Sequence, residues 1–136
     1  MDPPTPLEVW EVLFEKLGDD LRGVIRFQGT EYEAELREDV RQKYSSAEDR
    51  RVVDNAIINQ LATPKTEEAY KTGELDAFVN VFDEAWVIIL PMTIPSKSGY
   101  IVSVQRDGGT ATMDDVDWTI DRLTELLCDH GVTGCK

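Results

Sequence analysis

Histidine, cysteine and lysine are all scarce in this 136-residue chain. His130 is the only histidine, so acid–base or triad chemistry based on an imidazole would depend on one residue near the C-terminus. The two cysteines, Cys128 and Cys135, make a poor disulfide framework, which favours an intracellular, cytoplasmic location. The chain has no apolar run of about eighteen residues and no secretory signal at its start, so we expect no membrane-spanning helix.

Basic residues are outnumbered by acidic ones, 14 to 27, and the net charge is −13. Such a surface would repel nucleic-acid phosphates and anionic lipids, so we expect neither nucleic acid nor membrane as a partner. The acids are dispersed along the chain, and only six of the basic residues are lysines. Two interpretations stay open: a halophilic protein adapted to concentrated salt, and an ordinary acidic cytosolic domain.

Helical periodicity marks three segments. Residues 5–18 begin with a threonine N-cap followed by proline, and they end at a glycine. Ser45 and Glu48 form a capping box before a second helix that Pro64 ends, and a third helix begins at Thr112. The apolar stripes that we expect to be buried are Val9, Trp10, Leu13, Phe14 and Leu17 in the first helix, Val52, Val53, Ala56, Ile57 and Leu61 in the second, and Met113, Val116, Ile120, Leu123 and Leu127 in the third.

Residues 21–36 predict a β-hairpin. A two-residue turn would place Phe27 opposite Tyr32, which puts the apolar side chains of both strands on one core-facing side. The other side would carry Arg22 and Arg26 facing glutamates, and we expect that side to be wet.

The strongest apolar run, residues 85–92, predicts a second hairpin with residues 76–82. Asp83 and Glu84 would form its two-residue turn. Both sides of this hairpin are apolar, so we expect it to be covered on both faces and to lie toward the centre of the sheet. Residues 100–106 form the last strand.

The order of elements is therefore helix, two strands, helix, three strands, helix. It predicts an α+β fold in one domain, residues 1–136, with a five-stranded antiparallel sheet, helices on both faces and a C-terminal tail of about 129–136. This order resembles the roadblock/profilin-like architecture. The resemblance implies the strand order 2-1-5-4-3, two terminal helices on one face, and a non-enzymatic, dimerising interaction or scaffold module.

The sequence also resembles a family of small haloarchaeal proteins of unknown function. The segments that carry this resemblance are LGDDLRGVIRFQGTEYEAELREDV, YSSAEDRRVVDNAI, and FDEAWVIILPM leading to GYIVSV. The resemblance covers nearly the whole chain and agrees with the acidic composition. It contains no catalytic motif, so it implies no active-site residue.

Two motifs have both a chemical and a structural interpretation. The DGG sequence at residues 107–109 precedes a helix, but it lacks the spaced glycines and the Lys-Ser/Thr pair of a phosphate-binding loop, so we interpret it as a plain loop. Cys128, His130 and Cys135 offer three metal ligands where structural zinc uses four, so a C-terminal tail is preferred over a metal site. We therefore predict no catalytic residue and no cofactor.

An interface is indicated at two places. Trp118 lies outside the apolar stripe of its helix, so it either fills a gap beneath a loop or anchors an interface. In the implied order, strand 76–82 is an edge strand without lysine, proline or an inward charge to discourage pairing. We expect a homodimer that uses this edge, with Phe78, Asn80 and Phe82 as interface candidates, and a protein partner is also compatible with it.

Two alternatives accompany this expectation. Residues 66–73 could fold over the edge strand and cover it within one chain. A small-molecule-sensing domain of the profilin/PAS type, with a pocket between the sheet and a helix, is the alternative function.

Overall fold

The computed structural model describes residues 3–92 and 97–129. Its helices and strands follow the predicted order, with a short helix, α2, added before the second predicted helix and a separate helix, α4, after it. The elements are α1 (Pro6–Leu17), the 3-10 turn η1 (Gly18–Asp20), β1 (Leu21–Gln28), β2 (Glu31–Leu36), α2 (Glu38–Lys43), α3 (Ser46–Leu61), α4 (Thr63–Tyr70), β3 (Phe78–Val81), β4 (Ala85–Pro91), β5 (Ser98–Gln105) and α5 (Met113–Asp129).

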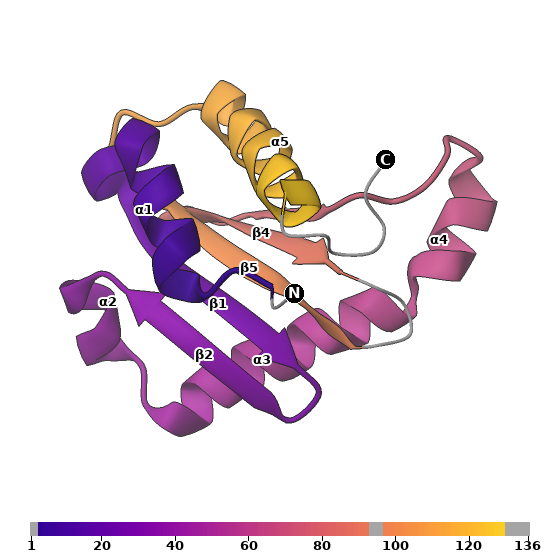
Figure 1. The fold of residues 1–136 in the computed structure, drawn as a ribbon, viewed down its shortest axis with the longest axis horizontal. Helices are drawn as coiled ribbons and strands as arrows, with labels where there is room; N and C mark the ends of the chain where they lie inside the picture. The colour runs from indigo at the N-terminus through magenta and orange to yellow at the C-terminus, as the bar shows by residue number, and fades with distance from the viewer. Residues whose placement is uncertain (1–2, 93–96, 130–136) are drawn as a thin grey trace.

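The five strands form one antiparallel sheet in the order β2-β1-β5-β4-β3, which confirms the order that the roadblock resemblance implied. The terminal helices α1 and α5 lie together on one face of the sheet, and α3 crosses the other face (Figure 1). α4 projects from the end of α3 away from the sheet (Figure 1). The expected α+β fold with helices on both faces is therefore confirmed.

Each face of the sheet has its own apolar core. The core under α1 and α5 is the larger one, and β4 and β5 contribute side chains to both. The buried residues on the α1/α5 face are Val9, Leu13, Leu17, Leu21, Val24, Trp86, Ile88, Leu90, Tyr100, Val102, Val104, Val116, Leu123, Leu126 and Leu127. Those on the α3 face are Ile25, Phe27, Val53, Ala56, Ile89 and Ile101.

The predicted helix caps are present. The Thr5 hydroxyl accepts a hydrogen bond from the Glu8 backbone N–H, and Ser45 and Glu48 bond each other reciprocally as a capping box. Gly18 ends α1 with φ of +53°, a conformation that favours glycine.

Three residues of the predicted buried stripes are exposed instead: Phe14, Leu61 and Met113. Leu61 is the last residue of α3 and Met113 is the first of α5, and the hydrophobic cores that bury these helices further along include neither. The Phe14 ring stacks on that of Trp10 with centroids 6.4 Å apart, outside the buried core.

The first hairpin has the predicted register, with Phe27 opposite Tyr32. Its second face is wet only along β2, where Glu31 and Glu33 are exposed; along β1 that face is covered, because α1 packs there and Val24 is fully buried. Arg26 lies on this covered face, where it donates to Glu33 and to the Pro3 carbonyl oxygen. Arg22 does not share that face, for a reason given below.

The second hairpin also has the predicted register, with Phe78 opposite Ile89 and Asn80 opposite Val87. Its predicted central position is correct for β4 only, because β3 is the edge strand of the sheet. The end of the hairpin is uncovered, since Val81 is 56% exposed and Phe82 is 55% exposed.

Two further predictions concern the C-terminal tail and membrane-spanning helices. Asp129, predicted to begin a tail, is the last residue of α5, and residues 130–136 lie outside the described part of the chain. Among the described residues, every helix is too short or too polar to cross a bilayer.

Candidate functional site

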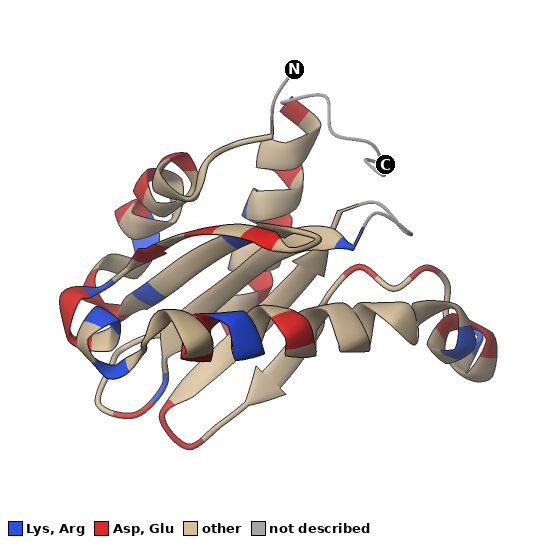
Figure 2. Cartoon of the chain, turned by 90° about the horizontal axis from the view of Figure 1, so that it is seen from below, with Lys and Arg blue, Asp and Glu red and all other residues tan. Residues whose placement is uncertain are grey.

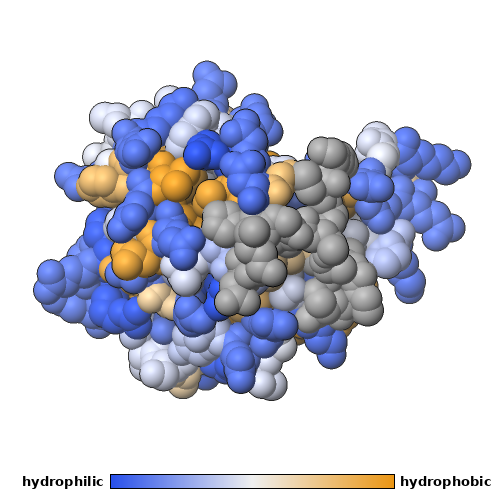
Figure 3. Space-filling view, in the orientation of Figure 1, coloured by the Kyte–Doolittle hydropathy of each residue, from blue (hydrophilic) through white to orange (hydrophobic). Residues whose placement is uncertain are grey.

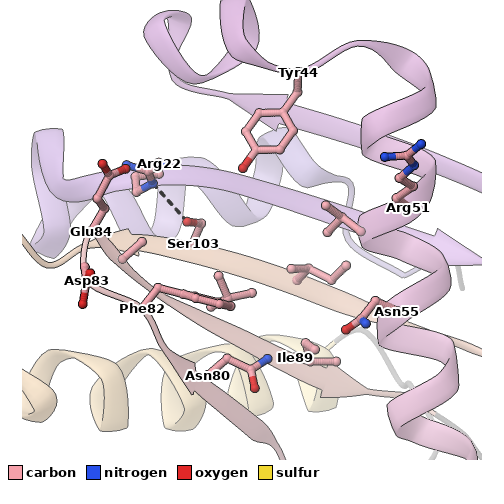
Figure 4. A pocket seen from close by; sticks show the side chains of 14 residues that line it. Arg22, Tyr44, Arg51, Asn55, Asn80, Phe82, Asp83, Glu84, Ile89 and Ser103 are labelled. Carbon is pink, nitrogen blue, oxygen red and sulfur yellow. Dashed lines mark hydrogen bonds between the residues drawn. The ribbon is translucent and has the colours of Figure 1, made fainter.

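A groove opens on the α3 face of the sheet, between the middle turns of α3 and the end of the second hairpin (Figure 4). Its volume is about 590 Å³, which is within the range of small-molecule sites. The residues that line it are Arg22, Tyr44, Arg51, Val52, Asn55, Asn80, Phe82, Asp83, Glu84, Ala85, Val87, Ile89, Ile101 and Ser103. The groove thus combines an apolar wall from the sheet with polar groups at both ends.

A β-bulge turns Arg22 into this groove. Leu21 pairs with Val104 and Gly23 with Ser103, so β1 holds one extra residue here and Arg22 has no partner on β5. The extra residue reverses the alternation of side chains, and Arg22 therefore lies on the α3 face rather than on the Arg26 face as predicted. A glycine inside a strand, here Gly23, is the sequence signal that could have indicated the bulge.

The Arg22 side chain is held by neutral groups. Arg22 is only 8% exposed, its Nε donates to Ser103 Oγ at 3.2 Å, and its Nη1 donates to Gln105 Oε1 at 2.9 Å. The Gln105 oxygen also accepts from Arg37 Nη2 at 3.0 Å, and its amide nitrogen donates to two backbone carbonyls. These bonds fix the guanidinium in place, while its Nη2 is bonded to no described residue.

Charged side chains lie at both ends of the groove. Arg51 extends from α3 on the Tyr44 side, and Asp83 and Glu84 come from the turn at the other end (Figure 4). No described carboxylate forms an ion pair with Arg22 or Arg51. Arg22 lies at the Glu84 end, because Gln105, to which Arg22 Nη1 donates, itself donates to the Glu84 carbonyl oxygen. The two arginines therefore lie at opposite ends of the groove (Figure 4).

Asp49 is the buried acid nearest this region, since it lines an adjoining cavity together with Arg22 and Tyr44. Burial raises the pKa of the Asp49 carboxyl, while Arg41, 3.6 Å away, acts in the opposite direction. Arg41 thus supplies the counter-charge of Asp49 and leaves Arg22 without one.

The predicted interface residues fall into two separate groups. Phe78, Asn80 and Phe82 follow one another on the face of the second hairpin that points to α3, and Asn80 and Phe82 line the groove. Trp118 lies on the opposite face of the sheet, where it packs against the core and the Lys16 Nζ lies 4.9 Å from the centre of its ring. Trp118 therefore packs against α1 residues here, and its use as an interface anchor stays a prediction.

The edge of β3 is unpaired. The Phe82 N–H donates to the Ala85 carbonyl, and hydrogen-bonded pairs alternate along antiparallel strands. The N–H and C=O groups of Phe78 and Asn80 therefore point to β4, and those of Val79 and Val81 point away from the sheet. No backbone group elsewhere in the described chain bonds to the outward pair, and α4 projects away from the sheet (Figure 1).

The candidate metal ligands do not form a described site. His130 and Cys135 lie outside the described residues, and Cys128, near the end of α5, is disulfide-bonded rather than a free thiol, contrary to the expectation of a poor disulfide framework. Within residues 3–92 and 97–129, no three His, Cys, Asp or Glu side chains gather as metal ligands would.

The DGG segment at 107–109 lies beside an acid rather than a phosphate site. One Asp20 carboxylate oxygen accepts hydrogen bonds from the Thr110 N–H and hydroxyl and from the Ala111 N–H. These donors, which could have bound an anion, are occupied by the protein's own carboxylate. The interpretation as a structural loop agrees with this geometry.

Comparison with known proteins identifies the fold and the family. The structure is similar to the crystal structure of a Roadblock/LC7 domain from Streptomyces avermitilis, with a TM-score of 0.57, 9% sequence identity, and coverage of 90% of this chain and 93% of that chain. At this identity the likeness concerns the fold, which is roadblock-like. The sequence matches the family described as "Domain of unknown function (DUF7522)" over residues 8–127, so the chain belongs to that family. No curated protein matches the sequence.

Proposed function

We propose that the protein is a non-enzymatic interaction module that forms a homodimer through the open edge of β3. The outward N–H and C=O groups of Val79 and Val81 are the observation that carries this proposal. Two copies related by a two-fold axis would pair these strands antiparallel and extend the sheet across both subunits. The roadblock-like fold, with its open β3 edge, supports this mode of assembly.

The surface beside the edge supports the same proposal. Asn55 of α3 lines one side of the groove, and β3 borders the opposite side of the groove. Ile58 lies about one turn after Asn55 on α3. Ile58 is 65% exposed and Leu61 is 58% exposed. The last charged residue of α3 is Asp54, and residues 55–61, which include these two side chains, carry no charge (Figure 2). Exposed apolar side chains on an uncharged helix segment are typical of an interface core.

Charge imposes a condition on this dimer. Each copy carries a net charge of −13, so two copies repel each other when little salt screens them. The proposal therefore includes a salt-adapted, cytoplasmic setting in which screening lengths are short. The acidic side chains are spread over the helices and turns (Figure 2), so the repulsion is general rather than confined to one surface.

The non-enzymatic part of the proposal rests on side-chain chemistry. Burial raises the pKa of the Asp49 carboxyl, but Asp49 has Arg41 as its ion-pair partner. Ser103 lines the groove and accepts a hydrogen bond from Arg22. Its hydrogen-bond partners among the described residues include no imidazole and no carboxylate that could activate its hydroxyl. These side chains supply binding groups but no activated nucleophile.

Sedimentation equilibrium at about 2 M KCl tests dimerisation, because the screening length is then below about 3 Å. We expect a mass near twice 15.4 kDa for the natural chain. Val81→Pro should give a monomer, since it removes an outward N–H without removing a bond to β4. Val81→Thr keeps the N–H and the β-branched shape and should remain dimeric. A monomeric natural chain at high micromolar concentration would contradict the proposal.

A second candidate function is the binding of a small molecule, and the groove favours it. The cavity lies between the sheet and α3, has an apolar wall, and contains a fixed cation. This arrangement fits a ligand-sensing domain of the profilin/PAS type. Binding and dimerisation are compatible, because α3 lines the groove with Arg51, Val52 and Asn55, whereas the proposed interface uses Ile58 and Leu61, which do not line it.

A further inference from the structure

We propose that the groove binds a small organic molecule with one carboxylate and an apolar body, and that Arg22 binds the carboxylate. This inference rests on the second candidate function, deepens it by naming the chemical class of the ligand, and does not depend on dimerisation. It is derived from the charge, burial and hydrogen bonding of the residues in the groove.

Arg22 differs from the ion-paired arginines in a way that points to a missing anion. Five arginines, at positions 26, 37, 41, 50 and 122, form ion pairs with carboxylates, and each of their side chains is at least 23% exposed. Arg22 is more deeply buried, at 8% exposure, yet its hydrogen bonds go to neutral oxygens and it forms no ion pair with a described carboxylate. Burying a cation without a counter-charge costs free energy. This chain has 27 acidic residues, yet it leaves the Arg22 cation unpaired, so an external anion that paired with Arg22 would gain free energy.

Three hydrogen-bond donors are available to such an anion at the same end of the groove. The first is Arg22 Nη2, which has no described partner. The second is the Ser103 hydroxyl, whose oxygen already accepts from Arg22 Nε, so that its own hydrogen can turn to a ligand. The third is the Tyr44 hydroxyl, which points from above the sheet toward Arg22 and Ser103 (Figure 4). A carboxylate has enough lone pairs to accept all three.

The sheet supplies the apolar part of the site. Val87, Ile89 and Ile101 form the floor, and Val52 of α3 forms one wall. Their branched side chains leave no polar partner for the middle of a ligand, so that part of the ligand must be apolar. The volume of about 590 Å³ is enough for a short aliphatic or aromatic acid.

Asp83 and Glu84 restrict the ligand further. They lie at the Arg22 end of the groove, opposite α3 (Figure 4), so any negative charge beyond the one that Arg22 compensates would be repelled there. Dicarboxylates and polyphosphates are therefore disfavoured, and a monocarboxylate, whose single charge Arg22 can compensate, is favoured. Asp49, in the adjoining cavity, is already paired with Arg41 and adds little repulsion there.

Three probes of nearly equal size test the sign of the charge: hexanoate, hexanamide and hexylammonium. Each is titrated into the natural protein at one fixed KCl concentration, and binding is followed by two-dimensional NMR of backbone amides. We expect hexanoate to bind at least about tenfold more tightly than hexanamide, with shifts at Ser103, Val87 and Val52, because a charge-assisted bond contributes more than a neutral one. Hexylammonium should bind most weakly.

Arg22→Met and Arg26→Met form a matched pair of variants. Arg26 lies on the other face of the sheet, so Arg26→Met should leave hexanoate affinity unchanged, whereas Arg22→Met should reduce it at least about tenfold. Arg22→Met should also unfold at the same or a higher denaturant concentration, because it removes an uncompensated buried charge. An arginine kept only for folding would show the opposite change.

The inference is overturned by any of three results: hexanoate binds no better than hexanamide, hexylammonium binds best, or Arg22→Met retains hexanoate binding. The probe series uses only the natural chain, so it is decisive even if Arg22→Met fails to fold. Failure of the probe series with a normal dimer in sedimentation would reject the ligand site and leave the dimer proposal intact.

Discussion

The burial of Ile88 is the most stringent local test of the sheet. Ile88 is 1% exposed in the middle of β4, where it lies between Val79 and Val102 and faces the α1/α5 core. Ile88→Ala removes the equivalent of three methylene groups, which costs about 2.4 kcal/mol at about 0.8 kcal/mol each. Surrounding strands can collapse only partly into the space, and the cavity raises the expected cost to about 3–4 kcal/mol. Ile88→Asn should cost more, because its amide would have no partner in this core.

Urea unfolding of the natural chain and of Ile88→Ala measures this cost, with the slope of the transition confirming that both unfold alike. Leu7→Ala is the control, since Leu7 has a similar side chain that is exposed on α1, the helix over which apolar side chains are visible in Figure 3. The control should lose less than about 1 kcal/mol. A change below about 0.5 kcal/mol for Ile88→Ala would mean that β4 is not covered by α1 and α5.

Two further predictions concern charge. The midpoint of thermal unfolding should rise markedly between about 10 mM and about 1 M KCl, because the screening length falls from about 30 Å to about 3 Å and thirteen unbalanced negative charges cease to repel one another. A midpoint that does not change with KCl would remove the case for salt adaptation. The hydrogen bond from the Arg37 guanidinium lowers the pKa of Asp39 to about 2, so the stabilising contribution of this pair should be complete above pH 3.8 and vanish as the pH falls through about 2. The unfolding curves of Asp39→Asn and the natural chain should therefore converge over that interval. Curves that stay equally far apart would show that the pair contributes nothing that depends on pH.

Local patterns in the sequence predicted the hairpins because two constraints act together there. A two-residue turn fixes which residues face each other, and alternation fixes which face is apolar, so the pairing of Phe27 with Tyr32 and of Phe78 with Ile89 followed directly. The order of strands in the sheet is a long-range property. Periodicity does not determine it, and the resemblance to the roadblock architecture supplied it.

The groove could not be predicted in the same way, because it depends on an exception to alternation. Strict alternation along β1 places Ile25 on the α3 face and Arg22 on the opposite face. The bulge between Leu21 and Gly23 moves Arg22 to the α3 face as well. The short helix α2 and the residues after it, which position Tyr44 over the sheet, lack a periodic apolar stripe. The helix ends were misjudged for a related reason: periodicity marks a face of a helix but not where the sheet beneath it ends, so Leu61 and Met113 were wrongly expected to be buried.

Amide hydrogen exchange at Val79 and Val81 tests the central claim, dimerisation through the β3 edge, most directly. Both N–H groups point away from the sheet, so in a monomer they should exchange about as fast as amides in an exposed loop. At about 2 M KCl we expect both to become protected as the protein concentration rises, while the exchange of Asn80, which bonds to β4, changes less. Rapid exchange of Val79 and Val81 up to high micromolar concentrations would contradict the account.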